Sequence, residues 1–148
     1  MRRTRFDDAP CPLARTSDLL GDWWSPLILR ELLLGRRRFA ELEDALEISK
    51  GVLAQRLRRF EDEGVVQRRR YQEHPPRDEY LLTDKGRALW GVLAAMWQYG
   101  DDWLFDERPG AQLELVDKRS GEAVRPQMID ANTGAPLDLA STRVRLRR

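Results

Sequence analysis

The sequence predicts an α+β fold in which four helices precede a two-stranded hairpin and a further helix follows it. Apolar residues recur at three- and four-residue spacing as far as about residue 62, which is the spacing of amphipathic helices. Residues 65–72 and 79–82 then alternate loosely around Pro75-Pro76, where two prolines exclude regular structure. Helical spacing returns after Thr83. This order of elements is that of a winged helix-turn-helix.

Proline and glycine mark the first two helices. Pro12 opens the first helix, which ends at Gly21, because the missing N–H of a proline costs nothing at the first helical position. Ser25 is expected to cap the second helix, with Pro26 behind it, and Gly35 supplies the left-handed residue that ends it. Few polar residues interrupt the second helix, so we expect it to be central to the core.

Two further helices form the predicted helix-turn-helix. The third helix starts near Phe39 and, after a short turn, Ser49 caps the fourth helix. The fourth helix carries an inner apolar stripe formed by Leu53, Leu57 and Phe60. Its other sides are polar and basic.

Composition restricts the class of protein. The chain has 148 residues, of which 34% are charged, and its mean hydropathy is -0.63. No apolar run approaches the roughly 20 residues that a membrane span needs, and the start of the sequence lacks the apolar region of a signal peptide. The single cysteine excludes an internal disulfide and a cysteine-cluster metal site. We therefore expect a soluble cytoplasmic protein without a metal, a cofactor or a membrane partner.

Positive charge is clustered although the net charge is only +1. The basic clusters are Arg36-Arg37-Arg38, Arg56/Arg58/Arg59 and Arg68-Arg69-Arg70. Binding of nucleic acid depends on a local basic footprint and not on the overall charge. Arginines can also simply solvate helix ends, but three clusters inside one motif favour DNA as the ligand.

The fourth helix carries the main candidates for contact with DNA. In this fold the N-terminal half of that helix meets base edges in the major groove. The candidates are Ser49, Lys50, Gly51, Ala54, Gln55, Arg58 and Arg59. Gln pairs with adenine and Lys or Arg with guanine, whereas Gly51 allows close approach of the phosphate backbone and Ser49 opens a helix terminus that binds phosphate. Arg56 lies near the inner stripe, which also suits a structural ion pair.

Further candidates for contact with DNA flank that helix: Arg37, Arg38, Arg70, His74 and Arg77. The tip of a wing reaches a minor groove, where arginine is favoured. Side chains alternate along a strand, so Arg69 faces away from Arg68 and Arg70, and the three cannot all touch DNA. His74 is the only histidine and has no partner for metal binding, so we expect it to face solvent.

The last helix is predicted from a Thr83-Asp84 cap to about Leu104, and it is apolar on more than one side. A surface helix needs one apolar stripe, so the surplus indicates a second buried surface. The simplest partner is a second copy of the chain, in a homodimer. Cover by the C-terminal segment is the alternative.

The chain divides into a predicted domain of residues 1–108 and an appendage of residues 109–148. Residues 113–116 and 144–146 alternate like strands. Between them, Asp117-x-x-Ser120-Gly121 and Asp130-x-x-Thr133-Gly134 repeat a turn motif. We expect a small β-meander.

Several motifs together resemble one family. They are Cys11-Pro12, Gly21-Asp22-Trp23-Trp24, Arg38-Phe39-x-Glu41-Leu42, Ile48-Ser49-x-x-Val52-Leu53-x-Gln55-Arg56-Leu57, Glu63-Gly64-Val65-Val66 and Pro75-Pro76-Arg77-x-Glu79-Tyr80-x-Leu82-Thr83. With this spacing, residues 11–104 resemble the HxlR-type winged helix-turn-helix regulators, relatives of the MarR group. The resemblance implies double-stranded promoter DNA as the ligand and a dimer built on the first and last helices. The tail resembles a zinc-ribbon-like appendage of some members, with Asp, Ser and Thr in place of the cysteine ligands, which implies a metal-free remnant.

Cys11 is the candidate sensor. A thiol at a helix N-terminus is made reactive by the helix dipole, and Arg15 lies one turn on. The resemblance implies that a cysteine at this place senses an oxidant or electrophile in some members. A small, buried, inert cysteine is the alternative. The five tryptophans suit a pocket for a small-molecule effector, although aromatics at helical spacing more often form core or interface.

The leading hypothesis is a homodimeric, sequence-specific DNA-binding transcriptional regulator. The alternative is a winged-helix protein-interaction module that does not bind DNA, because fold alone does not decide function. An enzyme lacks support, since the sequence has no Gly-rich phosphate loop, no second thiol or histidine and no cluster of metal ligands.

Overall fold

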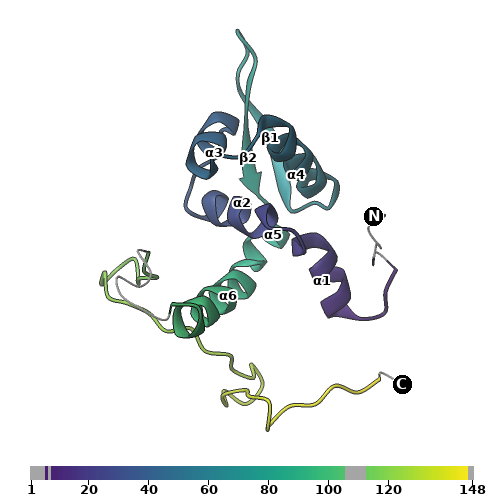
Figure 1. The fold of residues 1–148 in the computed structure, drawn as a ribbon, viewed down its shortest axis with the longest axis vertical. Helices are drawn as coiled ribbons and strands as arrows, with labels where there is room; N and C mark the ends of the chain where they lie inside the picture. The colour runs from purple at the N-terminus through teal and green to yellow at the C-terminus, as the bar shows by residue number, and fades with distance from the viewer. Residues whose placement is uncertain (1–5, 7, 106–112, 147–148) are drawn as a thin grey trace. The chain divides into compact units, whose positions relative to one another are not determined.

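A computed structural model of the chain describes residue 6, residues 8–105 and residues 113–146 (Figure 1). Its elements are α1 (Pro12–Leu20), α2 (Trp24–Leu33), α3 (Phe39–Leu46), α4 (Lys50–Asp62), β1 (Val66–Gln72), β2 (Arg77–Leu82), α5 (Asp84–Ala88) and α6 (Trp90–Trp103). The chain forms two compact units, residues 1–93 and residues 94–148, and α6 runs from the first into the second. No helix of the described residues is long and apolar enough to cross a membrane.

The predicted winged helix-turn-helix is confirmed. α3 and α4 form the helix-turn-helix, and β1 and β2 pair antiparallel from Val66 opposite Leu82 to Arg70 opposite Asp78. The register shifts between Arg70 and Gln72, which is a β-bulge. The hairpin extends beyond α3 and α4 as a narrow ribbon, which we call the wing (residues 66–82; Figure 1).

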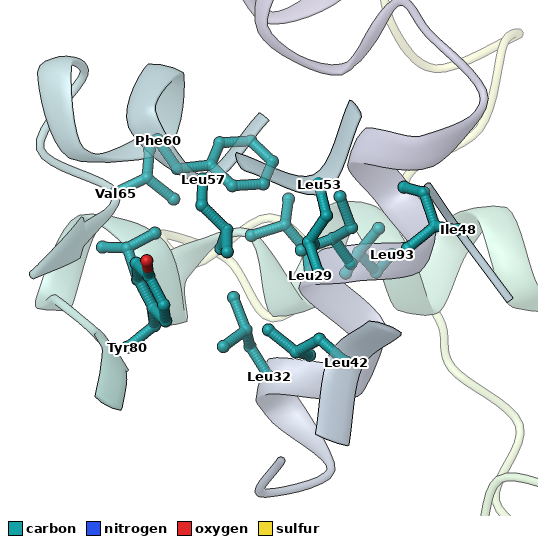
Figure 2. Close-up of a cluster of buried hydrophobic side chains, with 12 residues drawn as sticks. Leu29, Leu32, Leu42, Ile48, Leu53, Leu57, Phe60, Val65, Tyr80 and Leu93 are labelled. Carbon is teal, nitrogen blue, oxygen red and sulfur yellow. The ribbon is translucent and has the colours of Figure 1, made fainter. Parts of the chain in front are cut away.

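One hydrophobic core holds the first unit together (Figure 2). Fully buried side chains come from α2 (Ile28, Leu29), α3 (Leu42), α4 (Leu53, Leu57, Phe60) and the start of the hairpin (Val65). Full burial of such a side chain stabilises the fold by about 1.5–3 kcal/mol. The predicted inner stripe of α4 and the central place of α2 are both confirmed, so the core fixes which side of α4 faces outward.

The cap of α2 differs from the prediction. Asp22, not Ser25, satisfies the first amides: its Oδ1 accepts the N–H groups of Trp24 and Ser25, each at 3.0 Å. Ser25 is fully buried inside the helix, and its hydroxyl donates to Oδ2 of Asp22 at 2.5 Å. A carboxylate three residues earlier outcompetes the serine because it accepts several bonds and is favoured by the helix dipole. The Ser49 and Thr83 caps are confirmed, since these hydroxyls accept the N–H groups of Val52 and Gly86.

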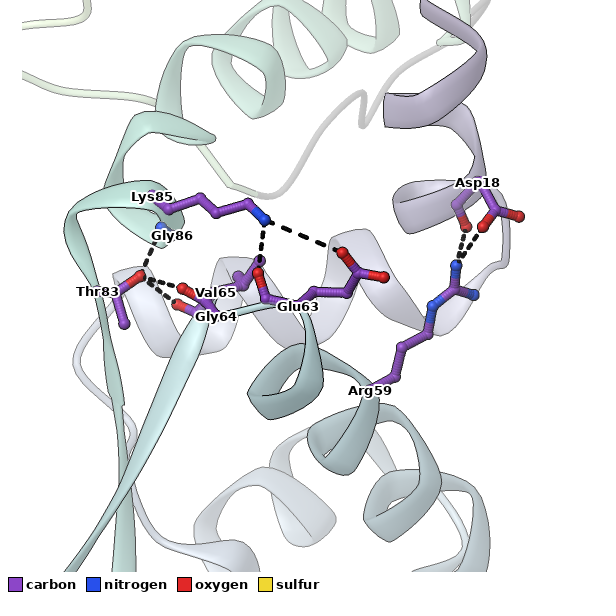
Figure 3. A network of polar contacts seen from close by, with 8 residues as sticks. All are labelled: Asp18, Arg59, Glu63, Gly64, Val65, Thr83, Lys85 and Gly86. Carbon is purple, nitrogen blue, oxygen red and sulfur yellow. Dashed lines mark hydrogen bonds and ion pairs between the residues drawn. The ribbon is translucent and has the colours of Figure 1, made fainter. Parts of the chain in front are cut away.

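The end of α4 is fastened to the start of α5 (Figure 3). The Thr83 hydroxyl lies 2.6 Å from the carbonyl of Gly64 and 3.1 Å from that of Val65. Lys85 Nζ donates to the carbonyl of Glu63 at 2.5 Å. Gly86 is buried at this joint, and a Cβ at its position would lie only 2.2 Å from the Val65 carbonyl oxygen. Glycine is thus required by close packing of two backbones.

The single long helix predicted after Thr83 is instead two helices. α5 ends at Ala88 and α6 begins at Trp90. Between them the N–H of Leu89 bonds to the carbonyl of Gly86 at 3.2 Å, three residues back, which is the tighter 3₁₀ spacing. The hydrophobic pattern continues across this local change, so periodicity alone did not reveal it.

The predicted β-meander is wrong for the described tail, residues 113–146, which contain no strand. Two isolated bridges, Val116 with Ala123 and Ile129 with Pro136, replace it. Val144 and Leu146 are almost fully exposed and pair with nothing described. Each bridge spans only one turn, which is too short for a ladder. The boundary predicted between residues 108 and 109 falls outside the described residues and stays a prediction.

The two repeated turns are closed by carboxylates. Oδ1 of Asp117 accepts the N–H groups of Arg119 and Ser120 at 2.7 and 3.1 Å. Asp130 Oδ1 likewise accepts the N–H of Asn132 at 2.9 Å. Zinc prefers thiolate or imidazole ligands, and these oxygens already hold backbone amides, so the residues do not fit a zinc ion. Within the described residues, no cluster of His, Cys, Asp and Glu suits a metal.

Candidate DNA-binding surface

α4 has one buried side and one exposed polar side. Gly51, Ala54, Gln55 and Arg58 follow each other at three- and four-residue steps and therefore share one face. Gly51, Gln55 and Arg58 are exposed, and Ala54 is half-buried. Because Leu53, Leu57 and Phe60 anchor the opposite side, this face is held rigidly outward.

The N-terminus of α4 is open to an anionic ligand. Ser49 and Lys50 are exposed, and a Cβ built on Gly51 would meet nothing within 4 Å. Free amides of the first turn and the positive end of the helix dipole favour a phosphate at such a place. The acidic residues Asp62 and Glu63 lie at the other end of the helix, so the charge of α4 is graded along its length.

Arg59 lies against α1 and not on the exposed face of α4. Its Nη2 donates to the carbonyl of Asp18 at 2.7 Å and to Oδ2 of Asp18 at 2.8 Å (Figure 3). The Asp18 side chain is only 5% exposed. We therefore assign Arg59 to the joint between α1 and α4, and no longer to contact with DNA.

Arg56 makes the second joint of this kind. Its Nε lies 3.1 Å from Oδ1 of Asp22, the cap of α2. Burial alone would raise the pKa of Asp22, but hydrogen bonds from Ser25 and Trp24 and the charge of Arg56 together hold it below its ordinary value. The structural ion pair suggested for Arg56 is confirmed, and α4 is tied to both preceding helices.

The Arg36–Arg38 cluster separates into three environments. Arg36 pairs with the buried carboxylate of Glu31, whereas the Arg38 guanidinium lies over the Tyr71 ring, 4.6 Å from its centroid. The Arg37 carbonyl accepts the N–H of Tyr80 at 2.7 Å, so this segment lies against β2. The Arg37 and Arg38 side chains remain exposed beside the wing.

Arginines of β1 pair with carboxylates of β2. Arg68 and Arg70 both bind Asp78, and Arg69 binds Glu79, with 2.8, 2.9 and 3.0 Å between each Nε and its carboxylate oxygen. The predicted alternation is confirmed, since Arg69 has a different partner from its neighbours. The Arg70 hydrogen bond is the main reason that the pKa of Asp78 lies below its ordinary value.

The pairing reduces the basic footprint that the sequence indicated. Exposed cations without an ion pair in the described part of the chain include Arg37, Lys50, Arg58 and Arg77. His74 is exposed in the turn of the wing, next to the start of β2. The candidates thus form a group on α4 and groups at the base and the tip of the wing. Sequence reasoning missed the acidic partners of the wing. The signal for them is Asp78-Glu79 just after the Pro75-Pro76 turn, because a hairpin brings these residues opposite the Arg68–Arg70 strand.

Cys11 is exposed and occupies the N-cap position of α1. The buried alternative is therefore wrong. Its carbonyl accepts the N–H of Arg15 at 3.2 Å, but the Arg15 side chain turns away to donate to the carbonyl of Ala9 at 2.6 Å. The thiol is thus reachable by solutes at a helix N-terminus.

The tryptophans do not gather into an enclosed pocket. Trp23, Trp90 and Trp103 are 89%, 45% and 71% exposed. Trp24 packs against the hydrophobic core. The aromatic residues are thus distributed between core and surface.

The fold is a winged helix, and the second helix of its helix-turn-helix, α4, presents an exposed polar side. These two features are those of the winged-helix DNA-binding proteins. A model of the HxlR-like helix-turn-helix family matches residues 19–108. The HTH-type transcriptional regulator sll1512 of Synechocystis, itself uncharacterized, is 48% identical over 98 residues, which are 66% of this chain and 73% of that protein.

Solved structures agree with this match. PA1607, whose crystal structure is described as that of a candidate transcription factor, superposes with a TM-score of 0.86 at 40% identity over 96% of this chain and 99% of that one. The reduced form of the redox regulator HypR gives a TM-score of 0.59 at 31% identity, over 62% of this chain and 92% of that one. The chain belongs to the HxlR-like helix-turn-helix family, and it is a DNA-binding transcriptional regulator.

Proposed function

We propose that the chain acts as a homodimer on double-stranded promoter DNA and reads base edges through the N-terminal half of α4. The observation that carries this proposal is the exposed pair Gln55 and Arg58 opposite a fully buried stripe, with Lys50 exposed at the N-terminus of the same helix. Lys and Arg pair with guanine and Gln with adenine in the major groove. Ser49, Gly51 and Ala54 allow the helix to approach closely.

The wing and the segment before α3 complete the proposed contact with DNA. Arg37 and Arg38 bind phosphates beside α4, and Arg70, His74 and Arg77 reach the neighbouring minor groove. Their exposure supports these roles. Phosphate contacts fix the register of a protein on the duplex, and base contacts choose the sequence.

The test is selection of genomic fragments on the purified protein, followed by affinity measurements on the selected operator. Replacing Lys50 and Gln55 by Ala is expected to abolish preference for the operator while weaker non-specific binding persists. Lys118→Ala, which removes one exposed positive charge from the tail, is the matched control. An interaction module would select no fragments and would show no steep loss of DNA binding with salt. Undiminished operator binding by the double variant would refute the assigned surface.

The dimer is proposed to form along α6. Val92, Met96, Tyr99 and Trp103 recur at three- and four-residue steps and are 39%, 49%, 60% and 71% exposed. Leu93 and Ala94 on another side are buried, so the exposed stripe is surplus to the core. A contiguous exposed apolar stripe is typical of an interface.

Sedimentation of two charge variants tests the dimer. Met96→Lys places a charge within the stripe and is expected to shift the protein toward monomer. Asp101 is exposed and lies on the opposite side of α6, so Asp101→Lys is the control and leaves the dimer intact. A monomeric wild-type protein, or a dimer unaffected by Met96→Lys, excludes this interface.

Cys11 is proposed as a sensor of oxidants or electrophiles that changes affinity for the operator. Its exposure at the N-terminus of α1 supports the role, as does similarity to the redox regulator HypR. Because the sequence has one cysteine, a disulfide of Cys11 has to form with a second copy or with an external thiol. Loss of operator binding on treatment with diamide, together with resistance of Cys11→Ser, supports the proposal. Equal responses of the two proteins contradict it.

A further inference from the structure

Three charged side chains gather on one face of the wing. Arg70 lies directly opposite Asp78, and Arg68 lies opposite Tyr80, so both arginines are neighbours of one carboxylate. Oδ2 of Asp78 accepts Arg68 Nε at 2.8 Å and lies 2.5 Å from Arg68 Nη2. Oδ1 accepts Arg70 Nε at 2.9 Å. We call these three residues the wing clamp.

The wing clamp lies on the face of the hairpin that also meets α4. Alternation places Arg68 and Arg70 on the same side as Val66, and Asp78 on the same side as Tyr80. Val66 and Tyr80 are buried in one cluster with residues of α4. The clamp therefore continues the α4-facing side outward along the wing, whereas Arg69 and Glu79 face the other way.

Exposure within the wing clamp is divided unequally. The Asp78 side chain is 12% exposed, whereas those of Arg68 and Arg70 are 53% and 46% exposed. Each guanidinium has five N–H groups, of which the carboxylate occupies one edge. The carboxylate is thus covered by its partners, and the remaining N–H groups are available to solvent.

We propose that Asp78 is a positioning residue for DNA binding, which holds Arg68 and Arg70 side by side so that their free N–H groups take neighbouring phosphates at the edge of the minor groove that the wing reaches. A free arginine side chain loses rotamer freedom when it is immobilised on a ligand, and pre-ordering removes that cost. The inference rests on the proposed contact between the wing and DNA. It adds Arg68 to the residues that contact DNA, and it makes an acidic residue, Asp78, favourable for DNA binding.

The opposite expectation follows from charge alone. A carboxylate near phosphates repels them and neutralises arginines, so its removal should tighten binding to any DNA. The two readings predict changes of opposite sign in operator affinity for the same substitution. Asp78→Asn is the informative variant, because it removes the charge and keeps the shape.

The experiment measures Kd for the selected operator and for an unrelated duplex at several salt concentrations. We expect Asp78→Asn to weaken binding to the operator and to the unrelated duplex alike, on the order of tenfold from the ordering cost of two side chains, because phosphate contacts do not depend on sequence. Glu73→Gln is the matched control, since Glu73 lies on the same hairpin, is 75% exposed and reaches Arg70 only at 4.0 Å. It is expected to tighten binding to both duplexes slightly.

Asp78→Glu, which restores the charge, is expected to recover part of the operator affinity. Circular dichroism establishes that each variant is folded. Tighter operator binding by Asp78→Asn, matching that of Glu73→Gln, overturns the positioning role.

Arginine variants separate this inference from the proposed function. The salt slope of DNA binding should fall by about 1 for each of the single variants Arg68→Ala and Arg70→Ala. When both arginines are replaced, adding Asp78→Asn should have little further effect on affinity. If both arginine variants keep the wild-type affinity and salt slope, the wing does not contact DNA and the clamp fails. Loss of operator binding on Lys50→Ala would show that α4 still reads DNA in that case.

Discussion

Replacing Gly86 by Ala places a methyl group where the backbone of Val65 already lies. The new Cβ would be 2.2 Å from the Val65 carbonyl oxygen and 2.9 Å from Cδ2 of Leu82, against ordinary contact at 3.4–4 Å. The carbonyl oxygen has to retreat by about 1.2 Å to reach ordinary contact. That carbonyl accepts both the N–H and the hydroxyl of Thr83, each at 3.1 Å.

The free energy of unfolding is expected to fall by about 2–5 kcal/mol. Loss of the two hydrogen bonds to Val65 costs about 1 kcal/mol each, and strain in the packed joint costs about 1–3 kcal/mol. Alanine returns at most about 1 kcal/mol through helix propensity. The melting temperature should therefore drop by roughly 8–40 °C, at 4–8 °C per kcal/mol for a domain of this size.

Thermal unfolding followed by circular dichroism measures this change. Gly91→Ala is the matched control, because Gly91 is exposed in α6 and a Cβ there would meet nothing within 4 Å. It should leave the midpoint equal or slightly higher. If Gly86→Ala is as stable as the wild type, the close approach of α5 to Val65 is not the constraint that we derive.

Three further predictions concern α4 and its neighbours. Gly51→Ala should stabilise the fold by up to about 1 kcal/mol, because the added methyl group meets no other atom of the protein. The same methyl group should weaken operator binding by obstructing the DNA, and tighter binding would refute a close approach of the DNA backbone to Gly51. Arg58→Ala should lower the salt slope of DNA binding by about 1 without a change in stability. Arg59→Ala should instead cost about 1–3 kcal/mol of stability, because it removes two hydrogen bonds between α4 and α1, and equal melting temperatures of the two variants would contradict this division. The folded-state pKa of Asp22 is lowered, so the stability that its carboxylate contributes is present above about pH 4 and is lost as the pH falls through the lowered pKa. In urea unfolding, the stabilities of Asp22→Asn and wild type should therefore differ near neutral pH and converge in acid. A difference that does not change with pH would exclude this linkage.

Local chemistry let the sequence predict most of the helix-turn-helix and the wing. The apolar spacing of Leu53, Leu57 and Phe60 gave the buried side of α4, and its complement gave the exposed side that carries Gln55 and Arg58. Hydroxyl caps at α4 and α5 were also predictable, because a cap depends on neighbours within three residues. Each of these features depends on short stretches of chain.

Tertiary structure alone decided which charges are free. Arg59 and Asp18 are 41 residues apart in the chain, and nothing in their local sequence reveals that they touch. Whether Arg68 and Arg70 are separate cations or one clamp depends on strand register, since a slip of one residue moves Asp78 to the other face. Electrostatic interactions follow distance in space, whereas secondary structure follows distance along the chain. The sequence therefore determined the elements and the orientation of α4, and the folded structure determined which arginines remain for DNA.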